Sequence, residues 1–345
     1  MSREKTRSQV VSRRPAAGGK DDRGSRQDAS GRRDSNGRKG REKPQLVSGR
    51  WLLLAICATI AAAVFCGWLG LCLLFWQGSW QLLYHPVAAA HPAADTHPAA
   101  AVARTPGSAG LAFDPVAFAV TDAGEPRLRG WWIPATQGAR FARFTVIYLH
   151  GADGNLGDTV DELVRLHGVG VNVLAFDYRG YGASQFTRPS EAHWRQDTEW
   201  ALDYLTGTRQ VDSGTIVLDG TGLGANLALE AAAEHPGLAG VVVDSPIDDP
   251  MGAIFNDARA RLVPARLLVR DRYDVDATAA VDRIPVLWFE RANGSGVGPA
   301  GARQEPEAYK KVAAHKMLVW LNPEGDVNKE AADAMSRWLD GLPAR

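Results

Sequence analysis

Hydrophobic and polar positions divide the chain into stretches of different character. From about residue 112 onward, short apolar runs alternate with amphipathic segments. The apolar runs predict strands at 116–123, 128–135, 145–151, 171–180, 215–220, 240–246, 284–290 and 316–322. Helical patterns in the intervals predict helices at 156–168, 190–207, 223–234, about 250–270, 304–315 and 328–341. This alternation predicts an α/β fold, with a mostly parallel sheet of about eight strands and helices on both faces.

One long apolar stretch precedes this domain. Residues 51–76 contain no charged side chain, and a helix of that length exceeds the roughly 30 Å of a bilayer's hydrocarbon core at about 1.5 Å per residue. Trp51 and Trp76 stand at its two ends, where aromatic side chains gather at membrane–water interfaces. We therefore predict a single-pass, uncleaved signal-anchor. The alternative is a signal peptide cleaved near residues 88–90.

Charge is spread unevenly along the chain. The whole chain has a formal net charge of zero, but residues 1–50 hold 15 Lys and Arg against 6 Asp and Glu, a net of +9, so the remainder carries −9. This Gly- and Ser-rich tail has too few large apolar side chains to fold alone, and we predict that it is disordered. The positive-inside rule places it in the cytoplasm and the C-terminal domain on the extracytoplasmic side, which is periplasmic in a bacterium. Because the tail lacks aromatic residues for base stacking, nucleic acid is a poorer match than a membrane surface.

The predicted organisation has four parts. A linker rich in Ala, Pro and His connects the span to the domain, and its three His-Pro pairs would suit a metal only on a folded scaffold. All three cysteines lie within the span, so the domain has no disulfide, no thiolate nucleophile and no cysteine metal site. The predicted parts are a basic tail at 1–50, a transmembrane helix at 51–76, the linker at 77–111 and the α/β domain at 112–345.

One glycine-rich turn admits two interpretations. Gly220, Gly222 and Ala225 follow a β-branched strand and precede an Ala-rich helix, which is the G-x-G-x-x-A spacing of a dinucleotide-binding turn. The same segment has the form of a nucleophile elbow, G-x-S-x-G, with Gly222 in place of the serine. A dinucleotide-binding turn usually belongs to the first βαβ unit, whereas this one follows about the fifth strand. The elbow is therefore the favoured interpretation.

Five further motifs carry a family resemblance. They are YLHGADGNLGD at 148–158, FDYRGYGAS at 176–184, PSEAHWRQDTEWALDYL at 189–205, DSPIDD at 244–249 and LLVRDRYDVDATAAVDRIPVLWFE at 267–290. In this order they resemble the α/β-hydrolase superfamily, and within it the membrane-anchored serine-hydrolase and peptidase-like branch. The resemblance covers roughly 112–345. It implies an α/β-hydrolase fold preceded by one transmembrane helix, with the catalytic site at the carboxyl edge of the sheet.

At the positions where the resemblance places the catalytic triad, this sequence lacks the side chains that the triad requires. The nucleophile position falls on Gly222, the acid position on Asn293 and Gly294, and the histidine position on Asp326. An acyl-transfer triad needs a nucleophile, a base within hydrogen-bond reach and an acid that orients the base. We therefore predict a degenerate triad at Gly222, Gly294 and Asp326, with no catalytic residue intact.

Other parts of the implied site remain in the sequence. The resemblance implies an oxyanion hole built from the backbone amides of Gly151 or Ala152 and of Leu223. Further candidates for the cleft are His150, Asp153, Asp177, Asp244, Asp248 and Asp249. The carboxylates could hold a cation or a basic partner. Solvated loop acids are the favoured interpretation, with Asp177 capping its own turn and His150 supporting its loop, so we predict no metal and no cofactor.

Three hypotheses of function follow, in order of preference. The first is a membrane-anchored pseudoenzyme that binds an unknown ligand or protein partner at the former active-site cleft. The second is an active esterase- or peptidase-like hydrolase that uses Ser184, Ser245 or a water molecule activated by an aspartate. The third is a dinucleotide-binding protein that uses Gly220, Gly222 and Ala225.

Overall fold

The computed structural model describes residues 47–88, 104–281, 283–291 and 304–343. Helix α1 (Gly49–Gly78) contains the predicted span and extends it by two residues at each end. Among the described residues, Gly49–Leu82 is the one helical stretch that is long and apolar enough to cross a membrane, judged by length and composition. Most of its side chains are exposed, but Cys72 and Phe75 near its C-terminal end are buried.

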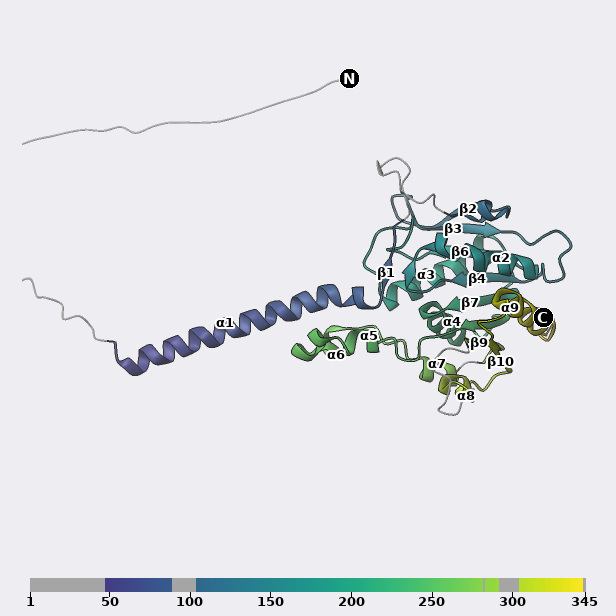
Figure 1. The fold of residues 1–345 in the computed structure, drawn as a ribbon. Coiled ribbons are helices and arrows are strands. Elements are labelled where there is room, and N and C mark those ends of the chain that lie inside the picture. The colour runs from purple at the N-terminus through teal and green to yellow at the C-terminus, as the bar shows by residue number, and fades with distance from the viewer. Residues whose placement is uncertain (1–46, 89–103, 282, 292–303, 344–345) are drawn as a thin grey trace, which may run out of the picture. The chain divides into compact units, whose positions relative to one another are not determined.

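The domain is built on an eight-stranded sheet, as predicted. Its strands are β2 (Asp114–Val120), β3 (Pro126–Ile133), β4 (Thr145–Leu149), β6 (Asn172–Asp177), β7 (Ile216–Thr221), β8 (Gly240–Asp244), β9 (Val286–Arg291) and β10 (Lys316–Leu321). The spatial order is β10-β9-β8-β7-β4-β6-β3-β2 (Figure 1). The six strands from β10 to β6 are parallel, whereas β3 pairs antiparallel with β6 and β2 pairs antiparallel with β3.

Helices cover both faces of this sheet. The principal ones are α2 (Val160–Val169), α3 (Glu191–Asp203), α4 (Leu223–Glu234), α7 (Val275–Val281), α8 (Glu307–Lys311) and α9 (Val327–Asp340). Successive strand residues point to opposite faces, so each central strand supplies two cores. Ile147 and Leu218 pack with α3, α4, α7 and α8, whereas Val146 and Val217 pack with α2 and α9. Burial on both faces explains why these strands are continuous apolar runs.

The region between β8 and α7 differs from the single helix predicted at about 250–270. It contains two short helices, α5 (Gly252–Phe255) and α6 (Ala265–Leu268), with a 3₁₀ turn (Ala258–Leu262) between them. Two residues explain the breaks. The side chain of Asp257 accepts a hydrogen bond from the Arg259 amide and begins the 3₁₀ turn, and Pro264 has no N–H to continue a helix.

Segments on both sides of the undescribed residues 89–103 pack on the domain, inside the predicted linker. The strand pair β1 (His85–Pro86) and β5 (Asp153–Gly154) joins the chain after α1 to the loop that follows β4. On the other side, Arg104 forms an ion pair with Asp161, with 2.8 Å between Nη2 and Oδ1. A two-residue pairing of this kind depends on tertiary contacts, so the composition of the linker gave no sign of it.

Candidate functional site

The carboxyl ends of three adjacent parallel strands define the candidate site. Strand β7 lies between β4 and β8, with Leu149 opposite Gly220 and Thr221 opposite Asp244. The amide of Gly222 donates to the carbonyl of Asp244 over 2.9 Å. The turn after β7 is therefore fixed against the end of β8, at the edge of the sheet where open α/β sheets bind ligands.

Gly222 has the backbone of a strained strand-to-helix turn. It stands at the N-cap of α4 with φ 58° and ψ −122°, a conformation that residues with a side chain rarely adopt. A Cβ atom built on Gly222 would meet no other heavy atom within 4 Å. The turn therefore presents its central position to open space, which is the arrangement that exposes the serine of a nucleophile elbow.

The flanking glycines have a different role. A Cβ on Gly220 would lie 2.2 Å from the carbonyl oxygen of Gly224, and a Cβ on Gly224 would lie 2.1 Å from that of Leu149. Both contacts are far shorter than any real Cβ contact, so the close approach of β7, α4 and β4 excludes side chains at both positions. Packing thus explains why glycine occupies positions 220 and 224, and no bound nucleotide is needed to account for them.

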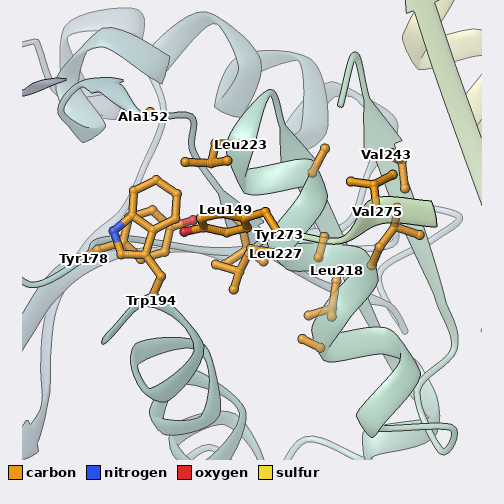
Figure 2. Close-up of a cluster of buried hydrophobic side chains, with 14 of the residues drawn as sticks. Leu149, Ala152, Tyr178, Trp194, Leu218, Leu223, Leu227, Val243, Tyr273 and Val275 are labelled. Atoms are coloured by element: carbon orange, nitrogen blue, oxygen red, sulfur yellow. The ribbon is translucent and has the colours of Figure 1, made fainter. Parts of the chain in front are cut away.

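The loop after β4 is held by buried polar contacts. The Tyr178 hydroxyl donates to the carbonyl of His150 over 3.2 Å, and the Tyr181 hydroxyl donates to the carbonyl of Ala152 over 2.8 Å. The Ala152 carbonyl also accepts from the His85 amide. Ala152 and Leu223 lie on one side of a buried cluster that includes Tyr178, Trp194 and Tyr273 (Figure 2). The two segments predicted to supply oxyanion-hole amides thus share one apolar support.

His150 and Asp177 lie within this support. The Nδ1 atom of His150 donates to the Gly151 carbonyl over 2.8 Å, and its Nε2 atom has no hydrogen-bond partner among the described residues. Burial lowers the pKa of His150 to about 4, so the ring is neutral. Asp177 accepts from the amides of Leu156 and Ala183, yet burial raises its pKa to about 6. Both residues are buried and have structural partners.

Comparison with known proteins identifies this architecture. A family model described as the alpha/beta hydrolase family matches residues 146–344, which is more than half of the chain. The chain belongs to the α/β hydrolase family. It is 33% identical over 223 residues to the uncharacterized protein Rv2307c of Mycobacterium tuberculosis, covering 62% of this chain and 75% of that protein. It is 33% identical over 205 residues to the uncharacterized protein YfhR of Escherichia coli K12, covering 58% and 69%.

Solved structures agree on the fold. The esterase Pf2001 of Pyrococcus furiosus superposes with a TM-score of 0.53 at 19% identity, over 76% of this chain and 99% of that one. The α/β hydrolase GrgF of a Penicillium species superposes with a TM-score of 0.51 at 18% identity, over 67% and 98%. At this level of identity the likeness shows the α/β-hydrolase fold alone.

The three positions predicted for the triad follow β7, β9 and β10 in the sequence, and these strands are parallel and end at one edge of the sheet. Gly294 lies outside the described residues, as does Asn293. Asp326 is the N-cap of α9, where its carboxylate accepts from the Lys329 amide over 3.0 Å. The assignment of a degenerate triad and of an oxyanion hole at Gly151, Ala152 and Leu223 stays a prediction.

The two serine candidates differ in their surroundings. The Ser184 hydroxyl donates to the Asp177 carbonyl over 2.6 Å and accepts from the Arg129 amide, so it holds its own turn together. The Ser245 hydroxyl donates to Oδ1 of Asp244 over 2.8 Å, at the strand end beside Gly222. Oδ2 of Asp244 lies 3.5 Å from the guanidinium of Arg291. Ser245 is thus the candidate that the fold brings to the elbow.

The remaining acidic candidates lie in loops around this edge. Asp249 accepts a hydrogen bond from the Gly252 amide just before α5. Asp248 and Glu290 line a pocket of about 180 Å³ with Glu305 and Glu307, and burial raises the pKa of Glu290. Asp153 accepts from Nδ1 of His85 over 2.7 Å. No group of three or more His, Cys, Asp or Glu within the described ranges could hold a metal ion.

The sequence reasoning missed two polar contacts. His85, from the predicted linker, pairs with Asp153 because β1 adds to the loop after β4. Asp219 of β7 is fully buried, and its carboxylate lies 3.7 Å from the guanidinium of Arg165. A single charged residue inside an apolar run was the available signal for Asp219, since a buried charge is seldom left without a partner.

Proposed function

We propose that this protein is a catalytically inactive member of the α/β hydrolase family that binds a ligand or partner at the former active-site edge. One observation carries the proposal. The elbow after β7 keeps the strained backbone and the excluded flanking side chains of a nucleophile turn, but its exposed position is Gly222, which has no side chain. A serine-hydrolase mechanism requires a nucleophile at that point.

The polar groups around the elbow support this proposal. Asp326, which takes the place of the base, caps a helix. His150 is buried, neutral and bonded to its own loop. The ring nitrogens of His193 and His235 pair with the Arg188 carbonyl and with Glu199. These contacts give His150, His193 and His235 structural partners in place of a hydroxyl to activate.

Membrane anchoring through α1 is the second part of the proposal. The helix has an uncharged stretch of 26 residues with exposed side chains over most of its length. A soluble domain that left these side chains in water would present a large apolar surface. We propose that the basic tail is cytoplasmic and that the domain lies on the opposite side. Resistance of the protein to extraction from membranes by alkaline carbonate tests the anchor.

Labelling with a fluorophosphonate tests the absence of a nucleophile. The full-length protein in detergent micelles is treated with the probe, alongside a heat-denatured sample and a known serine esterase. We expect labelling of the esterase alone. Stoichiometric labelling of the native protein that denaturation abolishes would overturn the proposal.

The pair formed by Ser245 and Asp244 favours a second candidate function, an active hydrolase with an unconventional nucleophile. Ser245 has a positive φ of 50°, and its hydroxyl already donates to a carboxylate. The Asp244 carboxylate also pairs with the Arg291 guanidinium, which is why this candidate ranks second. The variants Ser245→Ala and, as a matched control on α9, Ser336→Ala decide the point. Esterase turnover that Ser245→Ala alone abolishes would establish the second function.

A further inference from the structure

The C-terminal turns of α1 are packed on a segment of the domain. The indole Nε1 of Trp68 donates to the carbonyl of Leu262 over 3.0 Å. Cys72 and Phe75, one and two turns further on, are buried in the main core. From Trp51 to Trp68 the helix extends about 26 Å at 1.5 Å per residue, which nearly spans a hydrocarbon core of about 30 Å. The packed turns therefore begin close to where the helix leaves the bilayer.

The segment in contact with these turns comprises residues 252–272, which we name the cap segment. It contains five arginines and two acidic residues, a net charge of +3, in a remainder of the chain that is negative overall. All five arginines are exposed: Arg259, Arg261, Arg266, Arg270 and Arg272. Arg259 pairs with Asp257, whereas no ion pair within the described ranges engages Arg261, Arg266 or Arg270.

Large apolar side chains stand between these arginines. Leu267 is 83% exposed and Leu262 is 61% exposed, which is far more than an isolated aqueous surface favours. Leu73 and Leu74 of α1 are exposed as well. An open pocket of about 420 Å³ joins the two elements, since Cys72, Leu73 and Trp76 line it together with Leu267, Leu268 and Arg270. Figure 1 shows α5 and α6 beside the C-terminal half of α1.

We propose that the cap segment is a second membrane contact, which inserts Leu262 and Leu267 into the leaflet beside α1 and binds anionic phospholipid headgroups through Arg261, Arg266 and Arg270. This combination of exposed leucines and arginines on one short segment is the pattern of an interfacial membrane element. Long arginine side chains reach the phosphates while their stems stay in the apolar layer. The pocket formed with α1 is the place for the first methylene groups of a lipid chain.

Two observations favour a bilayer as the occupant. The cap segment is continuous with α1 through the Trp68–Leu262 bond and the shared pocket, so its apolar side chains lie beside those of the proposed anchor. Its positive charge is complementary to anionic lipid. The inference rests on the proposed anchoring by α1, and its test separates the two.

Depth measurements on the full-length protein in nanodiscs test the insertion. A spin label is attached at Leu262→Cys or Leu267→Cys in a background with Cys57, Cys66 and Cys72 replaced by Ser. Collision rates with oxygen, which concentrates in lipid, are compared with those of a water-soluble nickel complex. Leu54→Cys in α1 is the lipid reference, and Val120→Cys on β2, which is 64% exposed, is the aqueous reference.

We expect the labels at positions 262 and 267 to resemble the one at 54. If position 54 reports lipid and both cap positions resemble 120, the cap inference is wrong and the anchor stands. An aqueous label at position 54 contradicts the anchor and the cap contact together.

A second arm tests the arginines. The triple variant Arg261→Gln/Arg266→Gln/Arg270→Gln is compared with Arg143→Gln/Arg337→Gln, which alters exposed arginines elsewhere. Each arginine near an anionic surface strengthens binding about fivefold. In nanodiscs with about 30% anionic lipid, we expect the triple variant to raise the aqueous fraction of the label at 267 by at least about tenfold. Equal insertion of wild type and triple variant, with or without anionic lipid, would overturn the headgroup contact.

Discussion

The elbow after β7 and the loop after β4 meet at one edge of the sheet, but they are stabilised in different ways. Buried side chains hold the loop, through the hydroxyls of Tyr178 and Tyr181 and the carboxylate of Asp177. The elbow is held by backbone bonds and by the absence of side chains at Gly220 and Gly224. No element of either support requires a side chain at position 222.

This difference shows why the proposed loss of the nucleophile is compatible with an intact fold. A catalytic nucleophile projects away from the core, and a Cβ at Gly222 would contact nothing within 4 Å. Its removal therefore leaves no cavity and no unsatisfied partner. The residues that shape the edge are instead buried in contacts that folding itself requires, so they persist whether or not the site catalyses a reaction.

The largest expected effect is at a flanking glycine. In Gly224→Ala, the added methyl would lie 2.1 Å from the Leu149 oxygen and 2.5 Å from the His150 oxygen. Because backbone atoms must move, we expect a loss of about 3 kcal/mol or more in the free energy of unfolding. Chemical denaturation in detergent micelles, followed by tryptophan fluorescence, measures it. An effect no larger than that of Gly222→Ala would contradict the comparison.

The next largest effect concerns Asp177, which supports the loop after β4. Burial raises the pKa of Asp177 to about 6 from an ordinary 3.8, so the folded state favours the protonated acid. Its stabilising contribution is present below about pH 4 and is lost as the pH rises through about 6. Relative to wild type, Asp177→Asn should therefore gain on the order of 2–3 kcal/mol in unfolding free energy between about pH 4 and pH 7.

Denaturation curves at several pH values test this linkage. Asp333→Asn, on the exposed surface of α9, is the matched control. The difference in unfolding free energy between this variant and wild type should not change with pH. A difference for Asp177→Asn that also stays flat across this pH range would show that the carboxylate is ionised throughout. The loop would then be supported in a different way.

The fold could be predicted from the sequence because strands that are buried on both faces of the sheet consist of continuous apolar residues. Strands such as Thr145–Leu149 and Gly240–Asp244 are fully buried, and the eight strands were confirmed. The elbow could be found because a tight turn restricts residue size at Gly220 and Gly224. Local sequence patterns were sufficient wherever the constraint itself was local.

Contacts between distant segments could not be predicted in this way. His85 meets Asp153 and Tyr84 meets Asp271, over separations of 68 and 187 residues. No periodicity encodes such pairs, because each partner alone is compatible with a solvated loop. The same limit applies to Trp68 and Leu262, which only the folded chain brings together.

A smaller effect is expected at the centre of the elbow. Gly222→Ser places a side chain in open space but at φ 58°, so backbone strain alone should reduce stability by about 1–2 kcal/mol. With no base at Asp326, we expect no hydrolysis of p-nitrophenyl esters and no fluorophosphonate labelling. Turnover by this single variant, absent from Gly222→Ala, would reveal a base that the described histidines do not supply.

The smallest effect concerns Asp326, which stands at the predicted histidine position of the triad. Asp326 caps α9 through the Lys329 amide, and loss of an N-cap typically costs about 1 kcal/mol. Asp326→Ala should therefore lower the free energy of unfolding by about that amount, while Asp326→Asn, which keeps the acceptor, should be close to wild type. Denaturation in micelles compares the two variants. If Asp326→Ala were as stable as Asp326→Asn, the aspartate would have no capping role, and a function at the edge of the sheet would be the better reason for its presence.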